Sequence, residues 1–206
     1  MITYIIIALN CIVSFIGFRD KSFFGKYLFS PYSIQRNKKE WYRIFTHAFL
    51  HADYMHLLFN MFTFYSIGLV LELNSFQKNF PQHAEYYFVL LYVGGIMVSA
   101  FPGFEKHKND FGYSAVGASG AVCAVLFSYI LIEPTSQLSV FFIPMPAALF
   151  GAIFLLVSWY LSKRGGGRIA HDAHFWGGIF GFVFTILLKV SLLPAFFEKI
   201  KTFFLL

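Results

Sequence analysis

Charged residues are scarce in this chain of 206 residues, where they make up 13% of the sequence. A typical soluble domain carries about 25%. Hydrophobic residues instead reach 58% and aromatic residues 21%. This balance excludes an ordinary soluble domain and indicates a protein that is embedded in a membrane.

Cysteine is also rare. Cys11 and Cys123 both lie inside apolar runs, so the sequence contains no disulfide framework and no Cys-x-x-Cys metal site. The net charge of +6 is compatible with nucleic-acid binding. However, the Lys and Arg residues lie in short segments between apolar runs, where they ordinarily anchor a protein at the membrane interface. We therefore expect the lipid bilayer, and no nucleic acid, as a partner.

Long apolar runs recur along the chain, and each is a candidate for a helix that crosses a hydrocarbon core of about 30 Å. The six runs cover approximately residues 2–18, 54–73, 86–102, 119–132, 147–161 and 174–190. The first run has neither the basic start nor the A-x-A site of a cleavable leader, so we expect it to remain as a helix. The sequence predicts an all-α polytopic membrane protein with six transmembrane helices.

The segments between these runs predict a single domain over residues 1–206, since no polar linker divides the chain. Residues 19–53 mix charges in "RNKKEWYR" with aromatic residues in "SFFGKYLFSPY", which is typical of a loop in the membrane interface. Residues 191–206 place several phenylalanines near one helical face and predict an interfacial tail. The three glycines at 165–167 form either a turn between the fifth and sixth helices or a mobile gate.

Polar side chains inside membrane helices are costly, so each is a candidate for a functional role. They occur in three stretches: "HAFLHADYMHLLFN" at the second run, "GASGA" at the fourth and "AHDAHFWGGIFG" at the sixth. Alone, each stretch is explained by close helix packing through small residues or by a hydrogen bond between helices. The residues concerned are Gly117, Ser119 and Gly120, then His56 and Asn60, then Gly177 and Gly181.

Together the three stretches supply the roles needed to hydrolyse an amide, which are a nucleophile, a base and donors for the oxyanion. Ser119 offers a hydroxyl, and a neutral His, whose unperturbed pKa is about 6.5, can take its proton. His56 and Asn60, four residues apart on one helical face, can donate to an oxyanion together with the N–H of Ser119. Gly177 and Gly181 remove bulk from one face of the sixth helix, which can then approach the fourth.

Two histidines compete for the role of base. His171 and His174 are three residues apart and share a helical face. His174 is followed on its own face by Gly177, three residues later, and by Gly181, seven residues later. At the same distances from His171 lie His174 itself and Gly178, which line a path to the fourth helix less well. His171 also lies nearer to the glycine loop, where water should solvate it. We therefore assign the base to His174, and we expect Asp172 to face away from it.

The order of these stretches resembles the rhomboid family of intramembrane serine proteases. The matching elements are "WYRIFTHAFLHADYMHLLFN", "GASGA" and "AHFWGGIFG". The resemblance implies that Ser119 is the nucleophile and His174 its general base, in a dyad without an acidic third member. It also implies that His56 and Asn60 stabilise the oxyanion with the N–H of Ser119, and that residues 19–53 are the family's interfacial first loop. We expect no cofactor and no metal.

Substrates implied by the resemblance are membrane proteins with a single, locally unstable transmembrane helix, cut near the membrane surface. The small Phe-rich chain suggests a bacterial inner-membrane protein. Two arguments about its orientation disagree. The segments after the first, third and fifth helices carry most of the basic residues, so the positive-inside rule makes that side cytoplasmic. The resemblance implies that the active site, on the same side, opens outward. We follow the resemblance, because charges embedded in the interface at residues 19–53 count for less.

Two positions depart from the family pattern. Several members carry a Tyr four residues after the nucleophile, stacked on the base, whereas this chain has Cys123 there. Either another helix supplies the ring, or His174 is held less firmly. The adjacent tryptophan and arginine of the first loop are separated here, as Trp41 and Arg43, which leaves the packing of this loop open.

Two alternative functions remain. "HAFLH" and "HDAH" have the spacing of metal ligands, which is typical of a membrane di-iron oxidase or desaturase. That function leaves Ser119 unexplained. The second alternative is a catalytically inactive rhomboid-like protein that binds transmembrane helices, but a pure binder has no need of a serine, two histidines and an asparagine in these positions.

Overall fold

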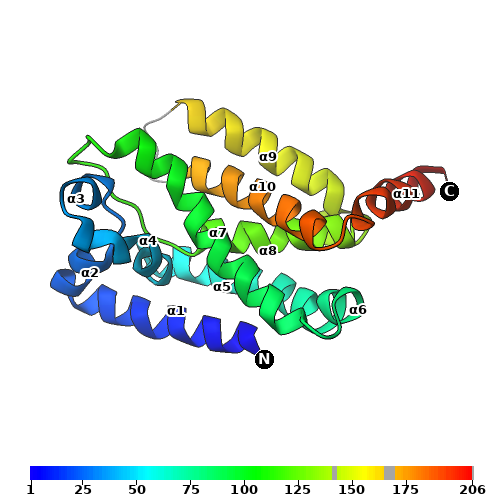
Figure 1. The fold of residues 1–206 in the computed structure, drawn as a ribbon, viewed down its shortest axis with the longest axis horizontal. Coiled ribbons are helices and arrows are strands. Elements are labelled where there is room, and N and C mark those ends of the chain that lie inside the picture. Colours follow the sequence, from blue (N-terminus) through cyan, green and yellow to red (C-terminus); the bar gives the residue numbers. More distant parts are fainter. Residues whose placement is uncertain (141–142, 165–169, 206) are drawn as a thin grey trace.

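The computed structural model describes residues 1–140, 143–164 and 170–205, and these are mostly helical (Figure 1). The glycine turn or gate predicted at residues 165–167 lies outside the described residues. Each predicted apolar run contains a principal helix, and several helices extend beyond the predicted ends. These helices are α1 (Ile2–Arg19), α5 (Tyr54–Val70), α7 (Ala84–His107), α8 (Ser119–Ile132), α9 (Ala147–Arg164) and α10 (His171–Leu188).

Not every one of these helices is long enough to cross a membrane. Among the described residues, four helical segments are long and apolar enough, namely Ile2–Arg19, Tyr54–Asn79, Ala84–His107 and Ala147–Arg164. α10 adds a fifth if it is counted with α11 (Leu192–Leu205), to which it is bent by 111°. α8 has 14 residues, which is about 21 Å of helix against a hydrocarbon core of about 30 Å. The structure thus supports four or five candidate spans, and a sixth at α8 stays a prediction.

α8 lies at the centre of the bundle, in contact with α5, α7, α9 and α10 (Figure 1). All of its residues after Ser119 are buried. A helix that is apolar on every side is stable in such a position, because none of its faces needs contact with water. α8 therefore holds Ser119 at the end of an element that is fixed by its neighbours on every side.

Glycines bring α10 close to α8. A Cβ atom on Gly177 would collide with the backbone carbonyl of Gly120, and one on Gly181 would collide with the carbonyl of Ala124. The glycine face predicted for the sixth helix is therefore the face that contacts α8. This close approach sets the position of the first turn of α10, which carries His174.

Glu72 holds the beginning of α1 against the end of α5. It lies in a π-helical turn, Leu71–Ser75, and is buried. Its carboxylate accepts hydrogen bonds from the N–H of Ile2 at 2.7 Å and from the N–H and hydroxyl of Thr3 at 2.9 and 2.6 Å. A negative charge is stabilised at a helix N-terminus by the unpaired N–H groups there. Glu72 thus lies inside a predicted span for a structural reason, because its carboxylate accepts hydrogen bonds at the start of α1.

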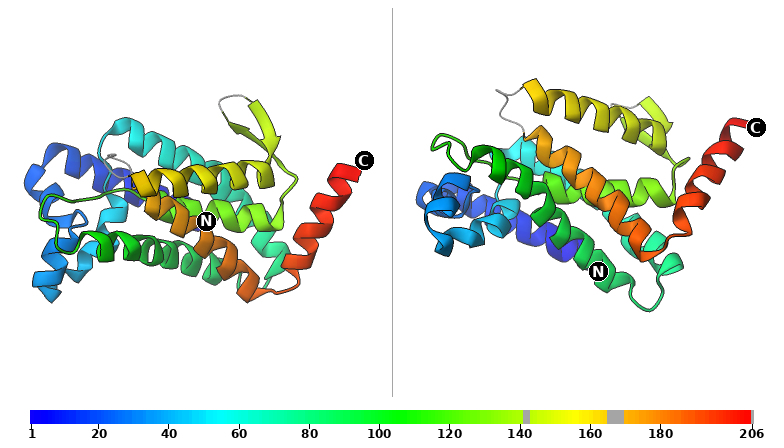
Figure 2. Two further views of the ribbon diagram at one scale, coloured as in Figure 1. Left: turned by 90° about the horizontal axis from the view of Figure 1, so that it is seen from above. Right: turned by 45° about the horizontal axis from the view of Figure 1, so that its top comes forward.

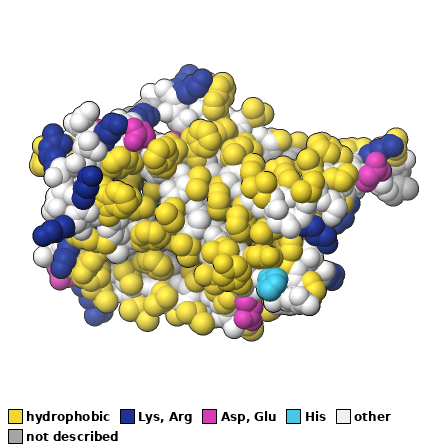
Figure 3. All heavy atoms as spheres, in the orientation of Figure 1, with side chains coloured by type: hydrophobic (Ala, Val, Ile, Leu, Met, Phe, Trp, Pro, Cys, Tyr) yellow, Lys and Arg dark blue, Asp and Glu magenta, His cyan; other side chains and the backbone are white. Residues whose placement is uncertain are grey.

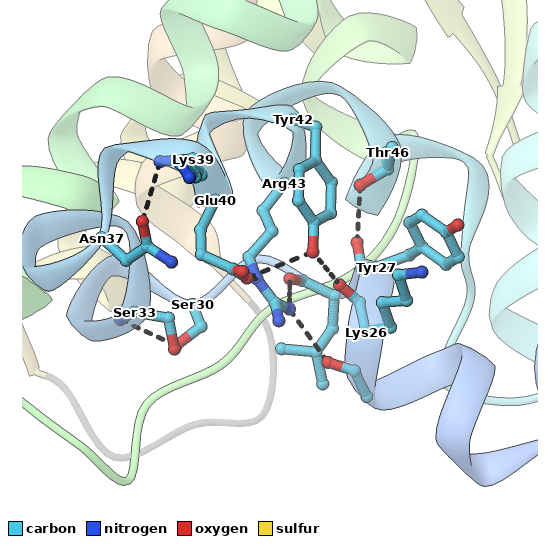
Figure 4. Close-up of polar contacts among 12 residues, drawn as sticks. Lys26, Tyr27, Ser30, Ser33, Asn37, Lys39, Glu40, Tyr42, Arg43 and Thr46 are labelled. Carbon is cyan, nitrogen blue, oxygen red and sulfur yellow. Dashed lines mark hydrogen bonds and ion pairs between the residues drawn. The ribbon is translucent and has the colours of Figure 1, made fainter.

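Residues 19–53 fold into short helices. These are α2 (Lys21–Tyr27), α3 (Pro31–Arg36) and α4 (Arg43–Thr46), with 3-10 turns at Lys38–Tyr42 and His47–Phe49. Arg43 connects them (Figure 4), because its guanidinium donates to the carbonyls of Gly25 and Leu28, both at 2.9 Å. It also pairs with Glu40, whereas Trp41 is exposed. Arg43 therefore ties α4 to α2, which answers the question of how this loop packs.

A short β-hairpin lies between α8 and α9, so the all-α prediction is wrong at this point. β1 (Gln137–Val140) pairs antiparallel with β2 (Ile143–Pro146). Pro144 and Pro146 are tolerated in β2 because each strand of a two-stranded sheet has a free edge, where a missing N–H breaks no ladder.

The surface separates apolar and basic regions. Hydrophobic side chains cover most of the face in Figure 3, and Lys and Arg gather toward the end where α2 and α3 lie. A broad exposed apolar surface of this kind fits contact with lipid. Figure 2 shows α11 leaving the bundle at an angle. Phe197 and Phe204 on this helix are exposed. The interfacial role expected for residues 191–206 stays a prediction.

Candidate active site

Ser119 is the first residue of α8, and the backbone before it makes a tight turn. Gly117 has a φ of +125°, which residues with a side chain rarely adopt. A Cβ atom on Gly117 would also lie 2.6 Å from Cε1 of His56. The N–H of Gly117 donates to the carbonyl of His47 at 3.0 Å. The turn leaves the N–H of Ser119 at the N-terminus of a helix, where it has no partner within that helix.

The side chains of Ser119 and His174 are hydrogen-bonded. Oγ of Ser119 and Nε2 of His174 lie 2.8 Å apart, although 55 residues separate them in the sequence. A neutral histidine at this distance can accept the proton of a serine hydroxyl. The structure therefore brings together the two residues that the sequence predicts as nucleophile and base.

His171 and Asp172 also lie on the first turn of α10, but in different positions. The ring of His171 is 5.9 Å from the ring of His174 and edge-on to it. Oδ1 of Asp172 accepts a hydrogen bond from the N–H of Ala173 at 2.9 Å. Oδ2 of Asp172 lies on the side of α7, 3.9 Å from the point where a Cβ atom on Gly103 would be. This position agrees with the expectation that Asp172 faces away from His174.

His56 lies on the first turn of α5, beside the turn that precedes Ser119. Its Nδ1 accepts the N–H of Ala52 at 3.5 Å, so the neutral ring carries its proton on Nε2. Nε2 is 2.8 Å from the position of a Cβ atom on Gly117. The N–H of the His56 ring is therefore on the side that faces the turn before Ser119.

Asn60 lies one turn further along α5, on the same face as His56, and is buried. Its Nδ2 donates to the carbonyl of His56 at 3.0 Å. This bond uses one of the two N–H groups of the amide, and the second remains for another acceptor.

The rhomboid resemblance assigns no role to His51, but the structure packs it against His56. The two rings lie 5.0 Å apart and are tilted by 73°. The hydroxyl of Ser14 on α1 donates to the carbonyl of Phe49 at 2.9 Å, so its oxygen accepts from Nδ1 of His51 at 2.8 Å. Burial lowers the pKa of His51 to about 3, so the ring is neutral at neutral pH. Ser14, a polar residue in the first apolar run, is the signal that could have indicated this support.

The ring beside His174 comes from α9. The ring of Phe154 is centred 6.1 Å from the imidazole, with 30° between the two planes. Cys123, one turn after Ser119 on α8, is buried. Of the two possibilities that the sequence leaves open, the structure thus favours a ring supplied by another helix.

A small cavity lies beside Ser119. It has a volume of about 30 Å³, which is room for on the order of two water molecules. Polar side chains on its wall come from the first loop, α7 and α10, namely His47, Ser99 and Asp172. A site that hydrolyses a bond needs such a place for water next to its nucleophile.

In a shared metal site, the histidines of the two His-rich stretches would point their ring nitrogens at one ion. In the structure, His47 and His174 make other contacts. Nδ1 of His47 is 2.9 Å from the carbonyl of Arg43, and Nε2 of His174 is bonded to Ser119. Within residues 1–140, 143–164 and 170–205, no three His, Cys, Asp or Glu side chains come together as metal ligands would. This arrangement gives the di-iron alternative no support.

Comparison with known proteins finds a Rhomboid domain over residues 38–191, which is more than half of the chain. The chain is also similar to the RHOMBOID-like protein 12, mitochondrial, of Arabidopsis thaliana, with 31% identity over 148 residues. The aligned part covers 65% of this chain and 42% of that protein, so the chain spans less than half of the relative's length. These matches confirm the resemblance seen in the sequence. The chain is a multi-pass membrane protein and belongs to the rhomboid family.

Proposed function

We propose that this protein is an intramembrane serine endopeptidase that hydrolyses peptide bonds in or near the transmembrane segments of membrane proteins. The observation that carries the proposal is the hydrogen bond of 2.8 Å between Oγ of Ser119 and Nε2 of His174. The bond occurs in a chain with a Rhomboid domain, in a family that includes serine proteases.

In the first half of the reaction, Oγ of Ser119 attacks the substrate carbonyl while its proton moves to Nε2 of His174. The carbonyl oxygen becomes an oxyanion, which the N–H of Ser119 and the side chains of His56 and Asn60 stabilise. When the C–N bond breaks, the leaving amine takes the proton from His174. An acyl group then remains on Ser119.

Water completes the reaction, and the cavity beside Ser119 gives it a place to bind. His174 takes a proton from this water while the water oxygen attacks the ester carbonyl. The proton passes to Oγ of Ser119 as the ester bond breaks. The carboxylic acid product leaves, and both residues return to their initial protonation states.

The substrates in this proposal are membrane proteins with a single, locally unstable transmembrane helix. In an intact helix each backbone carbonyl is hydrogen-bonded within the segment. The attacked carbonyl has to leave that bond before it can enter an oxyanion site. A substrate helix that unwinds easily near the membrane surface therefore reaches Ser119 most readily.

The proposal includes a single domain over residues 1–206 in the bacterial inner membrane, with six crossings of which α8 is the fourth. Residues 19–53 and 191–206 lie in the interface. Pairs of basic and aromatic side chains support an interfacial position for residues 19–53. For example, the guanidinium of Arg36 lies 3.5 Å from the centre of the Tyr32 ring, an arrangement suited to the headgroup region.

Orientation can be tested at Lys38, which is exposed at the active-site end of the bundle. We expect Lys38→Cys to react with an impermeant thiol reagent on intact cells, because the proposed active site opens outward. Lys201→Cys, exposed on α11 at the other end, should react only after lysis. The parent protein gives the background from its two cysteines. The reverse pattern would place the active site in the cytoplasm, as the distribution of basic residues suggests.

His56→Ala and Asn60→Ala should each slow cleavage on the order of 10²- to 10³-fold, the usual cost of removing one oxyanion donor. The peptide bond that is cut should not change, because neither residue selects it. Turnover of a purified model substrate and mass spectrometry of the products measure both quantities. Met55→Ala is a matched control, since Met55 is an exposed neighbour on α5. Activity at the parent level in either variant would leave that residue with a packing role only.

Labelling with a fluorophosphonate tests the proposed function directly, because this reagent forms a covalent bond with an activated serine. We expect the label on Ser119 of the purified protein, located by peptide mass spectrometry. An unlabelled but folded protein that still binds transmembrane helices would favour the inactive binder. Cleavage that is lost with a chelator and restored by iron would favour the metal enzyme.

A further inference from the structure

Phe154 of α9 contacts both of the helices that carry the proposed dyad. Its ring lies beside the imidazole of His174 on α10, with the centres 6.1 Å apart. The centre of the Phe154 ring also lies 6.0 Å from the centre of the Phe127 ring on α8. Both separations are within the range of ordinary aromatic pairs. One side chain thus connects the proposed base to the helix that begins with Ser119.

Glycines on two helices make room for this aromatic contact. A Cβ atom on Gly178 of α10 would lie 2.8 Å from the Phe127 ring, and one on Gly151 of α9 would lie 3.2 Å from it. Phe127 is buried between them. The position of the Phe127 ring is therefore fixed, and it limits where the ring of Phe154 can lie. From the sequence, Gly178 is a poorer lining than Gly177 and Gly181 for a path to α8. In the structure, Gly178 makes room for the Phe127 ring.

The orientation of His174 depends on packing. Among the described residues, the ring of His174 makes one hydrogen bond, from Nε2 to Ser119, and the proposed dyad has no carboxylate to hold the other nitrogen. A ring held by a single hydrogen bond can swing about that bond. Cys123, one turn after Ser119, is too short to prevent this motion, whereas a flat ring beside the imidazole restricts it. A misplacement of about 1 Å is enough to cost on the order of 10²-fold in rate.

We propose that Phe154 is a positioning residue for His174. This inference rests on the proposed function. α9 is the least buried of the four candidate spans, since 17% of its residues are buried, against 22%, 33% and 44% in the most apolar stretches of the other three. Its buried residues are Ala147, Gly151 and Ser158. The ring that restricts the imidazole thus comes from a helix with few buried residues.

Three variants on α9 test this inference. Phe154→Leu keeps an apolar side chain but removes the flat ring, so kcat should fall on the order of 10- to 100-fold with KM unchanged. The rate of fluorophosphonate labelling at Ser119 should fall by the same factor. Phe154→Tyr keeps the ring and should retain parent activity. Leu155→Ala is the matched control, because it removes a contact with Gly178 and leaves the ring beside His174 in place.

The outcomes separate positioning from ordinary packing. A loss of kcat in Phe154→Leu with activity retained in Phe154→Tyr and Leu155→Ala, at equal thermal stability, supports the inference. Equal losses in Phe154→Leu and Leu155→Ala, or parent-like kcat in Phe154→Leu, would overturn it. Failure of the proposed function looks different, since the parent protein would then not cleave, or cleavage would persist in Ser119→Ala.

Discussion

Ser119→Ala is expected to reduce cleavage of a model transmembrane substrate to background, while the protein inserts and purifies like the parent. Loss of the nucleophile removes covalent catalysis, which costs on the order of 10⁶-fold in a serine protease. The fold should tolerate the change, since it deletes one oxygen at a site already lined by Gly117 and Gly120. Purified protein in detergent or liposomes, with the fragments resolved on a gel, measures the effect.

Ser128→Ala is the matched control for this substitution. Ser128 is a buried serine of the same helix, and its hydroxyl donates to Oγ1 of Thr185 of α10 at 2.7 Å, because the Thr185 hydroxyl donates to the carbonyl of Gly181. We expect it to lower thermal stability and to leave cleavage intact. A strong chelator should also leave the parent protein active. Cleavage at the parent level by a clean preparation of Ser119→Ala would end the serine-protease proposal.

His174→Ala is expected to eliminate both cleavage and fluorophosphonate labelling, because it removes the group that takes the proton of Ser119. His171→Ala and Asp172→Ala should each keep a substantial fraction of activity. Only His174 among these three is bonded to Ser119 in the part of the chain that the structure describes. Asp172 is bonded to the N–H of Ala173 instead.

The three variants are matched to each other, since all lie on the first turn of α10 and all replace a polar side chain by a methyl group. Thermal unfolding of each protein shows whether a loss of activity reflects a loss of folding. An inactive His171→Ala beside an active His174→Ala would reverse the assignment of the base. It would also remove the argument that the glycine face of α10 directs His174 toward α8.

Local spacing predicts much of the site. The bounds predicted for α8 coincide with those observed, because a Gly-Ser stretch precedes the apolar run and a proline follows it. His56 and Asn60 share a face of α5 because a helix repeats about every four residues. The glycine face of α10 predicts its contact with α8, since Gly177 and Gly181 are four residues apart and so leave one side of the helix without bulky side chains.

Contacts between distant segments could not be predicted in this way. Neither the support of His51 by Ser14 nor the position of Phe154 beside His174 follows from the period of any single helix. Glu72 at the N-terminus of α1 is another example, since its partners are 69 and 70 residues away. Such pairs depend on which helices become neighbours, and hydrophobicity along one segment does not specify its neighbours.

A helix as short and as fully surrounded as α8 also constrains how the protein assembles. Its 14 residues are a poor match for a bilayer by themselves, and its face from Gly120 to Ala124 is covered by α10, which is synthesised after it. α8 therefore depends on a later helix for its final environment. On the proposed function, His174 arrives with that same helix. The newly made chain is then inactive until α10 docks against α8, and proteolysis can begin only after this contact has formed.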